Sequence, residues 1–342
     1  MLFGYFFGKD NKKLRITIAT PHFLLKKELR ITIFLVPLQT ISQKPKAKVY
    51  SIIIPHKNTA SLLERLLDSI PWGLSPQVIV VDNNSNGEEL QQVEMLRQRF
   101  DFLLCHSMGC GAGDARNIGL QHATGRWVLF ADSDDFFTPS AADLISAHAD
   151  DAADIVFFDV TSAYSDTLQP AYRDRSVKLL FQRYHREHDN PDALRCLYTN
   201  PWGKMIRRQL VIDNHIQFED IPSGNDCHFS VVAGLGARQV AIDERPLYCI
   251  TVRQGSITST LDMEHHESNG QSRLRVNRLL RQHGYGRYQL SVLYYIGMAR
   301  GFGWRYFLHA LRESCRHGNR PWVGLSRLLK PSTLGGIHYK QK

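Results

Sequence analysis

Short apolar runs of the strand type alternate with helical patterns between residues 49 and 131, and this alternation restricts the fold more than any other feature. The runs predict strands that are buried on both faces, and the segments between them predict helices: strands at 49–55, 78–81, 102–105 and 127–131, helices at 61–70, 88–100 and 114–122. Ser61 and Glu64 have the spacing of a capping box for the first helix. This order predicts an α/β fold with a mostly parallel sheet flanked by helices.

The charge of the chain changes sign along the sequence. The net charge is +9 over 342 residues, but residues 1–48 hold ten Lys and Arg against two Asp and Glu, and residues 271–342 hold 14 against one. The remaining segment, 49–270, therefore holds 18 against 30 and is acidic. This distribution favours metal or cationic chemistry in the middle and an anionic partner at the ends, either a membrane surface or nucleic acid. A basic tail that is merely solvated is the alternative.

Neither a membrane span nor a secretory signal is evident. No apolar run reaches the roughly 18 residues that a spanning helix needs, and the closest one, 291–311, is interrupted by Arg300 and Arg305. The first lysines, from Lys9, follow the apolar N-terminal residues instead of preceding them, and the six cysteines form no C-x-x-C pair. We therefore expect free thiols and a cytoplasmic location.

Residues 1–48 differ from the rest of the chain. The segment 14–18, Leu-Arg-Ile-Thr-Ile, recurs at 29–33, and two copies are too few for a solenoid that buries its own core. We predict a basic, poorly ordered N-terminal extension.

Polar clusters follow three of the predicted strands, at 55–58, 82–85 and 132–135. Ligands of parallel sheets bind at the carboxyl ends of the strands, so these clusters predict a site at one edge. Asp132 and Asp134 alternate along an extended segment and can face the same way, which suits Mg²⁺ or Mn²⁺ on the phosphates of a nucleotide. Aspartates that cap a helix starting near Pro139 are the alternative.

A glycine-rich turn at 109–119 precedes a helix that carries Arg116. It follows the third predicted strand rather than the first, so it fits a dinucleotide-binding fingerprint poorly. A tight turn that lets the backbone approach a ligand, with Arg116 as a cation near phosphate or base, is our interpretation. A glycine packing turn with a salt-bridged Arg116 is the alternative.

Four ordered segments, 51–58, 78–85, 115–119 and 123–135, resemble the nucleotide-sugar-binding half of inverting family 2 glycosyltransferases with the GT-A fold. The resemblance continues more weakly through 200–204, Phe218, 225–226 and 246–248 to 253–258, which is similar to the acceptor half of bacterial members that make polysaccharides. Together these segments cover roughly residues 49–258.

The resemblance implies a set of site residues and a divalent metal. Asp82 matches the position that contacts the uracil of a UDP-sugar, Arg116 matches the arginine beside the nucleotide, and Asp134 matches the metal-binding member of the Asp-x-Asp pair. The implied donor-binding residues are Pro55, His56, Asn58, Asp82, Arg116, Asp132 and Ser133.

The resemblance also implies a mechanism. Asp226 matches the general base, which takes the proton of the acceptor hydroxyl while that oxygen attacks the anomeric carbon and inverts it. An unperturbed aspartate, with a pKa of about 3.9, is ionised at neutral pH and can do this. A helix-cap aspartate is the alternative reading. Trp202 and Lys204 are candidates for the acceptor cleft, although a tryptophan beside Pro201 is often a packing residue.

The C-terminal segment, 271–342, alternates arginine with aromatic and aliphatic residues, and Leu274, Val276, Leu279 and Leu280 have helical spacing. Basic helices with exposed aromatic residues are typical of membrane-surface segments, so we predict docking on an anionic membrane, the inner face of the plasma membrane, where lipid-linked acceptors lie. A packed helical cap with an arginine-rich outer face is the alternative.

The sequence therefore predicts a hexosyl- or N-acetylhexosaminyl-transferase that uses a nucleotide-sugar, a UDP-sugar first, and a glycan or lipid-linked glycan acceptor. We expect a donor half at 49–145, an acceptor half at 146–262 and a basic helical region at 263–342. A metal-dependent nucleotidyltransferase or nucleotide-dependent hydrolase is a second interpretation. A nucleic-acid-binding protein is a third, which the acidic middle disfavours.

Overall fold

A computed structural model of the chain describes residues 49–109, 111–253, 262–320 and 322–323, and the extension predicted for residues 1–48 lies outside this part. The described residues belong to one unit that starts at Ala47. No helix in these described ranges is long and apolar enough to cross a bilayer. The three-part division predicted within 49–342 stays a prediction.

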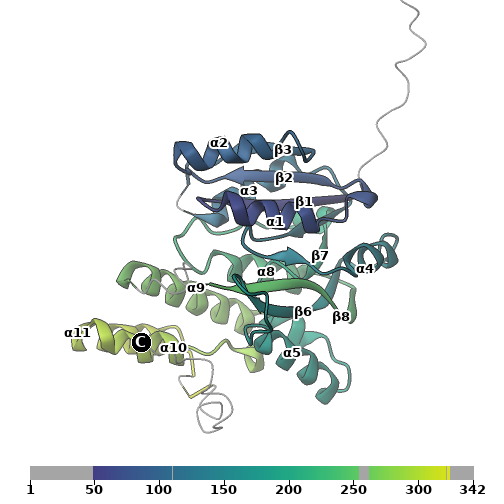
Figure 1. Cartoon of the computed structure of the whole chain (residues 1–342). Coiled ribbons are helices and arrows are strands. Elements are labelled where there is room, and N and C mark those ends of the chain that lie inside the picture. Colours follow the sequence, from purple (N-terminus) through teal and green to yellow (C-terminus); the bar gives the residue numbers. More distant parts are fainter. Residues whose placement is uncertain (1–48, 110, 254–261, 321, 324–342) are drawn as a thin grey trace, which may run out of the picture. The chain divides into compact units, whose positions relative to one another are not determined.

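A mixed sheet lies at the centre of this unit (Figure 1). Its strands are β1 (Tyr50–His56), β2 (Gln77–Asp82), β3 (Phe102–His106), β4 (Trp127–Phe130), β5 (Phe136–Phe137), β6 (Ile155–Tyr164), β7 (Lys204–Arg207) and β8 (Val240–Val252). Across the sheet they are ordered β3-β2-β1-β4-β7-β6-β8-β5. The strand β1 is buried along its whole length, as its β-branched apolar sequence predicts.

The sheet combines parallel and antiparallel pairs. β1 lies parallel to β2 and β4, β2 is parallel to β3, and β6 is parallel to β8. The short strand β7 is antiparallel to both β4 and β6, and β5 is antiparallel to β8. The predicted α/β class is confirmed, and the parallel part is the half that the sequence pattern described.

The helices follow the predicted alternation through the first half of the unit. They are α1 (Ala60–Ser69), α2 (Gly87–Leu96), α3 (Ala112–His122), α4 (Ala141–Ala147), α5 (Arg175–Arg186), α6 (Asp192–Leu197), α7 (Arg208–Asp213), α8 (Asn225–Gly236), α9 (Met263–Gln282), α10 (Leu293–Ala299) and α11 (Trp304–Arg316). The predicted capping box is wrong, because α1 begins at Ala60 and Thr59 is its N-cap. The backbone N–H of Ala60 donates instead to Glu89 at 2.7 Å, and Glu64 pairs with Arg99.

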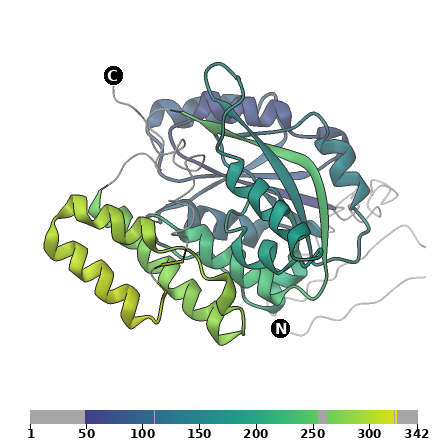
Figure 2. The same cartoon turned by 90° about the horizontal axis from the view of Figure 1, so that it is seen from below.

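Helices α9, α10 and α11 pack together at one side of the unit (Figures 1 and 2). Leu274, Val276 and Leu280 are buried, so the helical periodicity read from the sequence is confirmed. The carboxylate of Glu267 on α9 accepts hydrogen bonds from the hydroxyls of Tyr295 at 2.8 Å and Tyr306 at 2.6 Å, which ties the three helices to one another.

The sheet curls, so that the last part of β8 returns to the end of β4. The backbone N–H of Asp132 donates to the Tyr248 hydroxyl at 2.8 Å, and the N–H of Thr251 donates to Asp135 at 2.7 Å. Residues 131–135 therefore run between β4, in the middle of the sheet, and β5, at its edge, with β8 contacting them on the way.

Candidate functional site

The carboxyl ends of three neighbouring parallel strands bring the predicted donor residues together. Pro55 and His56 end β1, Asp82 ends β2, and Asp132 follows β4 by two residues. His56 is the register partner of Asp82 across the β1–β2 pair. Because β1 lies between β2 and β4, all these residues share the edge of the sheet at which ligands of such folds bind.

The His56–Asp82 pair is buried at this edge. Nδ1 of His56 lies 3.1 Å from Oδ1 of Asp82, and the Ser85 N–H donates to Oδ2 at 3.2 Å. Burial favours the neutral acid, but the hydrogen bonds from Ser85 and His56 outweigh it, so the pKa of Asp82 lies below its ordinary value. Asp82 is therefore an ionised acceptor at neutral pH.

Asn58 connects the end of β1 to the loop after β2. Its φ of 51° lies in the left-handed region, which asparagine tolerates better than most residues. Its N–H donates to the Ser85 hydroxyl and its side-chain oxygen accepts the N–H of Asn86, both at 2.9 Å. The predicted polar segments 55–58 and 82–85 therefore form one hydrogen-bonded structure.

Arg116 joins the donor half of the site to α8. It is buried, with 5% of its surface exposed, and its Nη2 donates to Asp132 at 2.6 Å while Nη1 donates to the Asn225 side chain at 3.0 Å. Glycine at position 113 permits this approach, because a Cβ there would lie 2.4 Å from the carbonyl oxygen of Glu219. The salt bridge offered as the alternative for Arg116 is present, and it lies within the site.

The three aspartates of the 132–135 segment have different surroundings. Asp135 is buried and accepts the Thr251 N–H, and burial, with the nearby charges of Asp134 and Asp132, raises its pKa well above the ordinary value. Asp134 lies 3.2 Å from Nε of Arg253, and its pKa is raised by burial and by Asp132. Asp132 and Asp134 keep about a quarter of their side-chain surface exposed, whereas Asp135 is a structural residue.

The donor set fits a metal that is shared with a ligand. Among the residues that the structure describes, no three His, Cys, Asp or Glu side chains gather as a metal-binding group. Mg²⁺ is usually held by one or two carboxylates together with substrate phosphates, and Mn²⁺ also takes oxygen ligands. The mutual repulsion of Asp132 and Asp134, seen in the raised pKa of Asp134, is what a divalent cation would relieve.

Asp226 lies in the first turn of α8, directly after Asn225. Burial raises its pKa, the positive charge of Arg116 opposes this shift, and Asp132 adds to it. Asp226 follows Asn225, whose side chain accepts a hydrogen bond from Arg116, so the start of α8 lies at the Asp132–Arg116 pair. Asp226 therefore lies at the start of a helix, as the alternative interpretation stated. It also lies near the predicted donor residues, as the resemblance implied.

The acceptor-side candidates do not line an exposed surface. Trp202 has 4% of its surface exposed and stacks on Tyr248, with ring centroids 6.2 Å apart. Lys204 has 2% exposed, and its Nζ donates to the carbonyls of Tyr198 at 2.6 Å and Asn200 at 2.5 Å. Burial lowers the pKa of Lys204 to about 7, and attraction to Asp226 opposes that shift. Trp202 and Lys204 are therefore both packing residues in this structure. The charge of Lys204 is also attracted to that of Asp226.

Several residues in the site had no role assigned from sequence. Thr59 bonds to the Ser133 hydroxyl at 2.9 Å, Tyr248 and Arg253 contact Asp132 and Asp134, and Asn225 receives Arg116. Three of these residues lie in segments that resemble the family, namely Tyr248, Arg253 and Asn225. That resemblance was the sequence signal that could have identified them as site residues. Thr59 gave no sequence signal.

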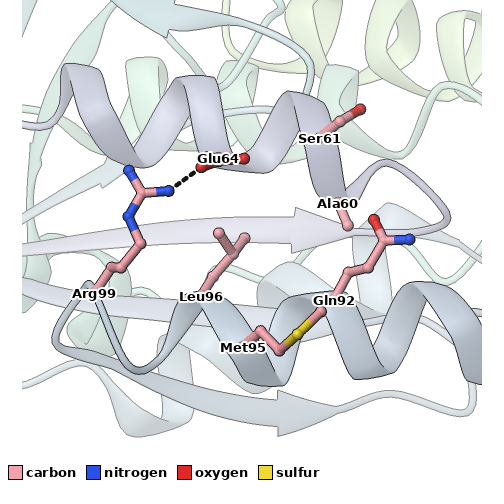
Figure 3. Close-up of a pocket in the computed structure, with 7 residues that line it drawn as sticks. All are labelled: Ala60, Ser61, Glu64, Gln92, Met95, Leu96 and Arg99. Carbon is pink, nitrogen blue, oxygen red and sulfur yellow. Dashed lines mark hydrogen bonds and ion pairs between the residues drawn. The ribbon is translucent and has the colours of Figure 1, made fainter.

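A pocket of about 290 Å³ opens between α1 and α2 (Figure 3). It is lined by Ala60, Ser61, Glu64, Gln92, Met95, Leu96 and Arg99, and Arg99 pairs with Glu64 across it. None of the predicted site residues contributes to its lining.

Comparison with known proteins identifies a matching family and similar chains. Residues 51–214 match the model of glycosyl transferase family 2. Poly(ribitol-phosphate) beta-N-acetylglucosaminyltransferase TarS of Staphylococcus aureus is 28% identical over 222 residues, which are 62% of this chain and 37% of TarS. EpsH of Bacillus subtilis is 23% identical over 229 residues, 64% of this chain and 65% of EpsH. The matches thus span less than two thirds of either relative.

Solved structures show the same fold. The 1–349 portion of S. aureus TarS in complex with UDP-GlcNAc superposes with a TM-score of 0.55 at 20% identity, covering 83% of this chain and 77% of that one. A mannosyltransferase from Pyrobaculum calidifontis, in complex with GDP-Man and Mn²⁺, gives 0.50 at 16% identity and covers 85% and 82%. Residues 51–214 therefore form a glycosyl transferase family 2 domain, and the fold is GT-A.

Proposed function

We propose that the protein is an inverting glycosyltransferase that moves a hexose or N-acetylhexosamine from a UDP-sugar to a hydroxyl of a glycan or lipid-linked glycan during polysaccharide synthesis. One observation carries the proposal: Arg116 bonds to Asp132 and to Asn225, so that the donor carboxylates and the Asp226 helix meet in one site. The names of the relatives support the donor class, because TarS is an N-acetylglucosaminyltransferase that was crystallised with UDP-GlcNAc.

In the proposed reaction Asp226 accepts the proton of the attacking hydroxyl. Asp82 accepts a hydrogen bond from the base, and Asp132 and Ser133 contact the ribose and diphosphate side of the donor. A Mn²⁺ or Mg²⁺ ion held by Asp134 would offset the charge that develops on the leaving diphosphate. Arg116 bonds to Asp132 and its positive charge also attracts Asp226.

Asp134→Asn should separate ligand binding from folding. The raised pKa of Asp134 means that its ionised form is disfavoured in the folded chain, so the neutral amide should leave the melting temperature of the free protein unchanged or higher. The wild type should gain about 2.7 kcal/mol of stability from UDP-GlcNAc at 100 times its Kd with Mn²⁺, and the variant should lose the part that depends on the metal. Thermal unfolding with UDP-, GDP-, CMP- and dTDP-sugars, with and without Mn²⁺, measures both effects.

Asp150→Asn is the matched control, because Asp150 is an aspartate with 99% of its side chain exposed and it pairs only with Arg126 among the described side chains. It should behave as the wild type. A full Mn²⁺-dependent shift in the Asp134 variant would contradict the metal assignment. The absence of any shift with every nucleotide sugar would contradict the proposed function.

We also propose that the α10–α11 region docks on an anionic membrane. Its exposed side chains include apolar ones, Tyr294, Met298, Trp304 and Leu308, and basic ones, Arg300, Arg305, Arg312 and Arg316. This composition is typical of helices that lie in a lipid headgroup layer. It supports a peripheral location on the inner face of the membrane.

Vesicle co-sedimentation tests the docking surface. Binding to vesicles with anionic lipid should exceed binding to neutral vesicles, and Arg305→Gln with Arg312→Gln should weaken it about 30-fold, since each arginine contributes about 1 kcal/mol near such a surface. Trp304→Ser should weaken binding to anionic vesicles as well, whereas Met95→Ser, which changes an equally exposed residue on α2, should not. Equal partition onto neutral and anionic vesicles would argue for the packed helical cap instead.

A further inference from the structure

Both ring nitrogens of His56 have partners, and 1% of its surface is exposed; besides the two contacts that follow, the Ser85 hydroxyl lies 3.4 Å from Nδ1. Nδ1 lies 3.1 Å from Oδ1 of Asp82, and Nε2 lies 3.2 Å from the backbone nitrogen of Thr59. The ring therefore connects the end of β2 to the first residues of α1.

The two contacts together fix the proton of the ring. The backbone N–H of Thr59 can only donate, so Nε2 of His56 must accept and carries no hydrogen. The neutral ring then has its hydrogen on Nδ1, which donates to the Asp82 carboxylate. A second proton on Nε2 would place an N–H donor opposite the N–H donor of Thr59. Burial also lowers the pKa of His56, which agrees with a neutral ring.

This tautomer holds the Asp82 carboxylate in one orientation. Oδ1 is directed at the buried His56 ring, and Oδ2 faces the Ser85 N–H at 3.2 Å and the exposed His106, whose Nδ1 is 3.9 Å away. Oδ2 is thus the oxygen that lies next to the exposed His106. A nucleobase that contacts Asp82 would meet this oxygen.

The contact continues from His56 to the diphosphate end of the site. Thr59, whose N–H is held by the His56 ring, bonds through its own hydroxyl to the Ser133 hydroxyl at 2.9 Å. Ser133 lies between Asp132 and Asp134. One series of hydrogen bonds therefore runs from Asp82 through His56 and Thr59 to the acidic segment.

We propose that His56 is a positioning residue for nucleotide recognition, which as its Nδ1–H tautomer fixes the Asp82 carboxylate and, through Thr59, the place of Ser133. The inference rests on the proposed function, because it takes Asp82 as a contact of the base. Uracil offers one N–H between two carbonyl groups, whereas guanine offers two adjacent N–H donors that can pair with both oxygens of a carboxylate. A carboxylate with Oδ1 held by His56 favours the single donor of uracil.

The test measures the Kd values of UDP and GDP, each with Mn²⁺, by calorimetry on three variants. His56→Asn retains an N–H donor close to the place of Nδ1, His56→Gln moves the amide toward the place of Nε2, and His56→Phe removes both. The Asn variant keeps the donor to Asp82 and loses the acceptor for Thr59, so it should keep the preference for UDP over GDP and bind UDP more tightly than the Gln and Phe variants do. The Gln and Phe variants should lose about 10- to 100-fold in UDP affinity, the range for a hydrogen bond to a charged group, and should lose preference for UDP over GDP.

The UDP to GDP ratio distinguishes positioning from general destabilisation, because unfolding would weaken both nucleotides alike. In turnover assays the loss should appear in the KM of the donor, with kcat at saturating donor retained. If the Phe variant does not fold, the Asn and Gln pair still provides the comparison.

A nitrogen-15 spectrum of the ring nitrogens tests the tautomer without any ligand. Among the 15 histidines, the signals of His56 are those absent from the Asn variant. A neutral Nδ1–H ring at pH 7 is expected, and an Nε2–H ring or a doubly protonated one would overturn the inference.

The binding data distinguish failure of this inference from failure of the proposed function. If the wild type binds UDP and the Gln and Phe variants bind it equally well with the same preference over GDP, the role of His56 is wrong and the transferase proposal stands. If the wild type binds neither nucleotide, the proposed function fails and the nucleotide role of His56 fails with it.

Discussion

Replacement of Asp226 by asparagine is expected to lower kcat by about 10²- to 10⁴-fold, the usual contribution of a general base. The amide cannot take the acceptor proton, while the donor contacts at Asp82 and Asp132 remain, so the Kd of UDP should stay within a few-fold of the wild type. The kcat is measured as release of UDP from the UDP-sugar that stabilises the protein in the thermal unfolding experiment, with a lipid-linked glycan fraction as acceptor. The Kd of UDP is measured by calorimetry.

The pH dependence of kcat gives the same prediction a second readout. Burial raises the pKa of Asp226, and a base works only when it has lost its proton, so kcat should fall as the pH drops through this raised pKa. This limb should lie above about pH 3.9, the ordinary value for aspartate. The sequence suggested an unperturbed aspartate, and the partly buried start of α8 is the reason that it differs.

The control for Asp226 is Asp213→Asn, an exposed aspartate at the end of α7, which should retain full kcat. The raised pKa also means that ionised Asp226 lowers stability at neutral pH, so its asparagine variant should be at least as stable as the wild type. A variant that keeps kcat within a few-fold of the wild type would exclude Asp226 as the base.

Replacement of Arg116 by methionine should lower the free energy of unfolding by about 3 kcal/mol, the lower end of the range for breaking a buried ion pair. The lower end applies because Asp132 keeps 29% of its side chain exposed, and water can solvate it once Arg116 is gone. Arg116→Lys should lose a smaller amount, since lysine keeps the charge but cannot donate to Asp132 and Asn225 in the same fork.

Urea unfolding measures the change, with Arg97→Met as the matched control. Arg97 forms an exposed pair with Glu94 on α2, with about half of each side chain in solvent, and such pairs contribute little. The control should shift the free energy of unfolding by less than about 0.5 kcal/mol. A loss below 1 kcal/mol in the Arg116 variant would mean that the connection between the two halves of the site is not a source of stability.

Strands β1, β2 and β4 could be predicted because they are buried along almost their whole length and their sequences are continuous apolar runs. The helix start at Ala60 could not, because the N–H of Ala60 is bound by Glu89, from the next helix, and not by a residue of the predicted Ser61–Glu64 capping box. A cap supplied by a residue 29 positions away leaves no local pattern.

The donor edge of the site could be predicted for a similar reason. Parallel strands place their carboxyl ends at one edge of the sheet, so the sequence placed Asp82 and Asp132 at the same edge, where they lie on either side of β1. Packing of Trp202 was stated as the alternative, but the burial of Lys204 could not be foreseen, because it depends on the antiparallel insertion of β7 between β4 and β6. The role of Thr59 depends on a contact with Ser133, 74 residues away, and no periodicity reports such a contact.

The placement of β5 restricts how this chain can be recombined with its relatives. Phe136 and Phe137 belong to the predicted donor segment by sequence, yet they pair with Tyr248 and Cys249 on β8. A hybrid that took residues 49–145 from another family member would pair a foreign β5 with the native β8. The foreign acidic segment before β5 would then be positioned by the native β8. Exchange of donor specificity by module swapping should therefore require residues 246–252 to be transplanted together with the donor segment.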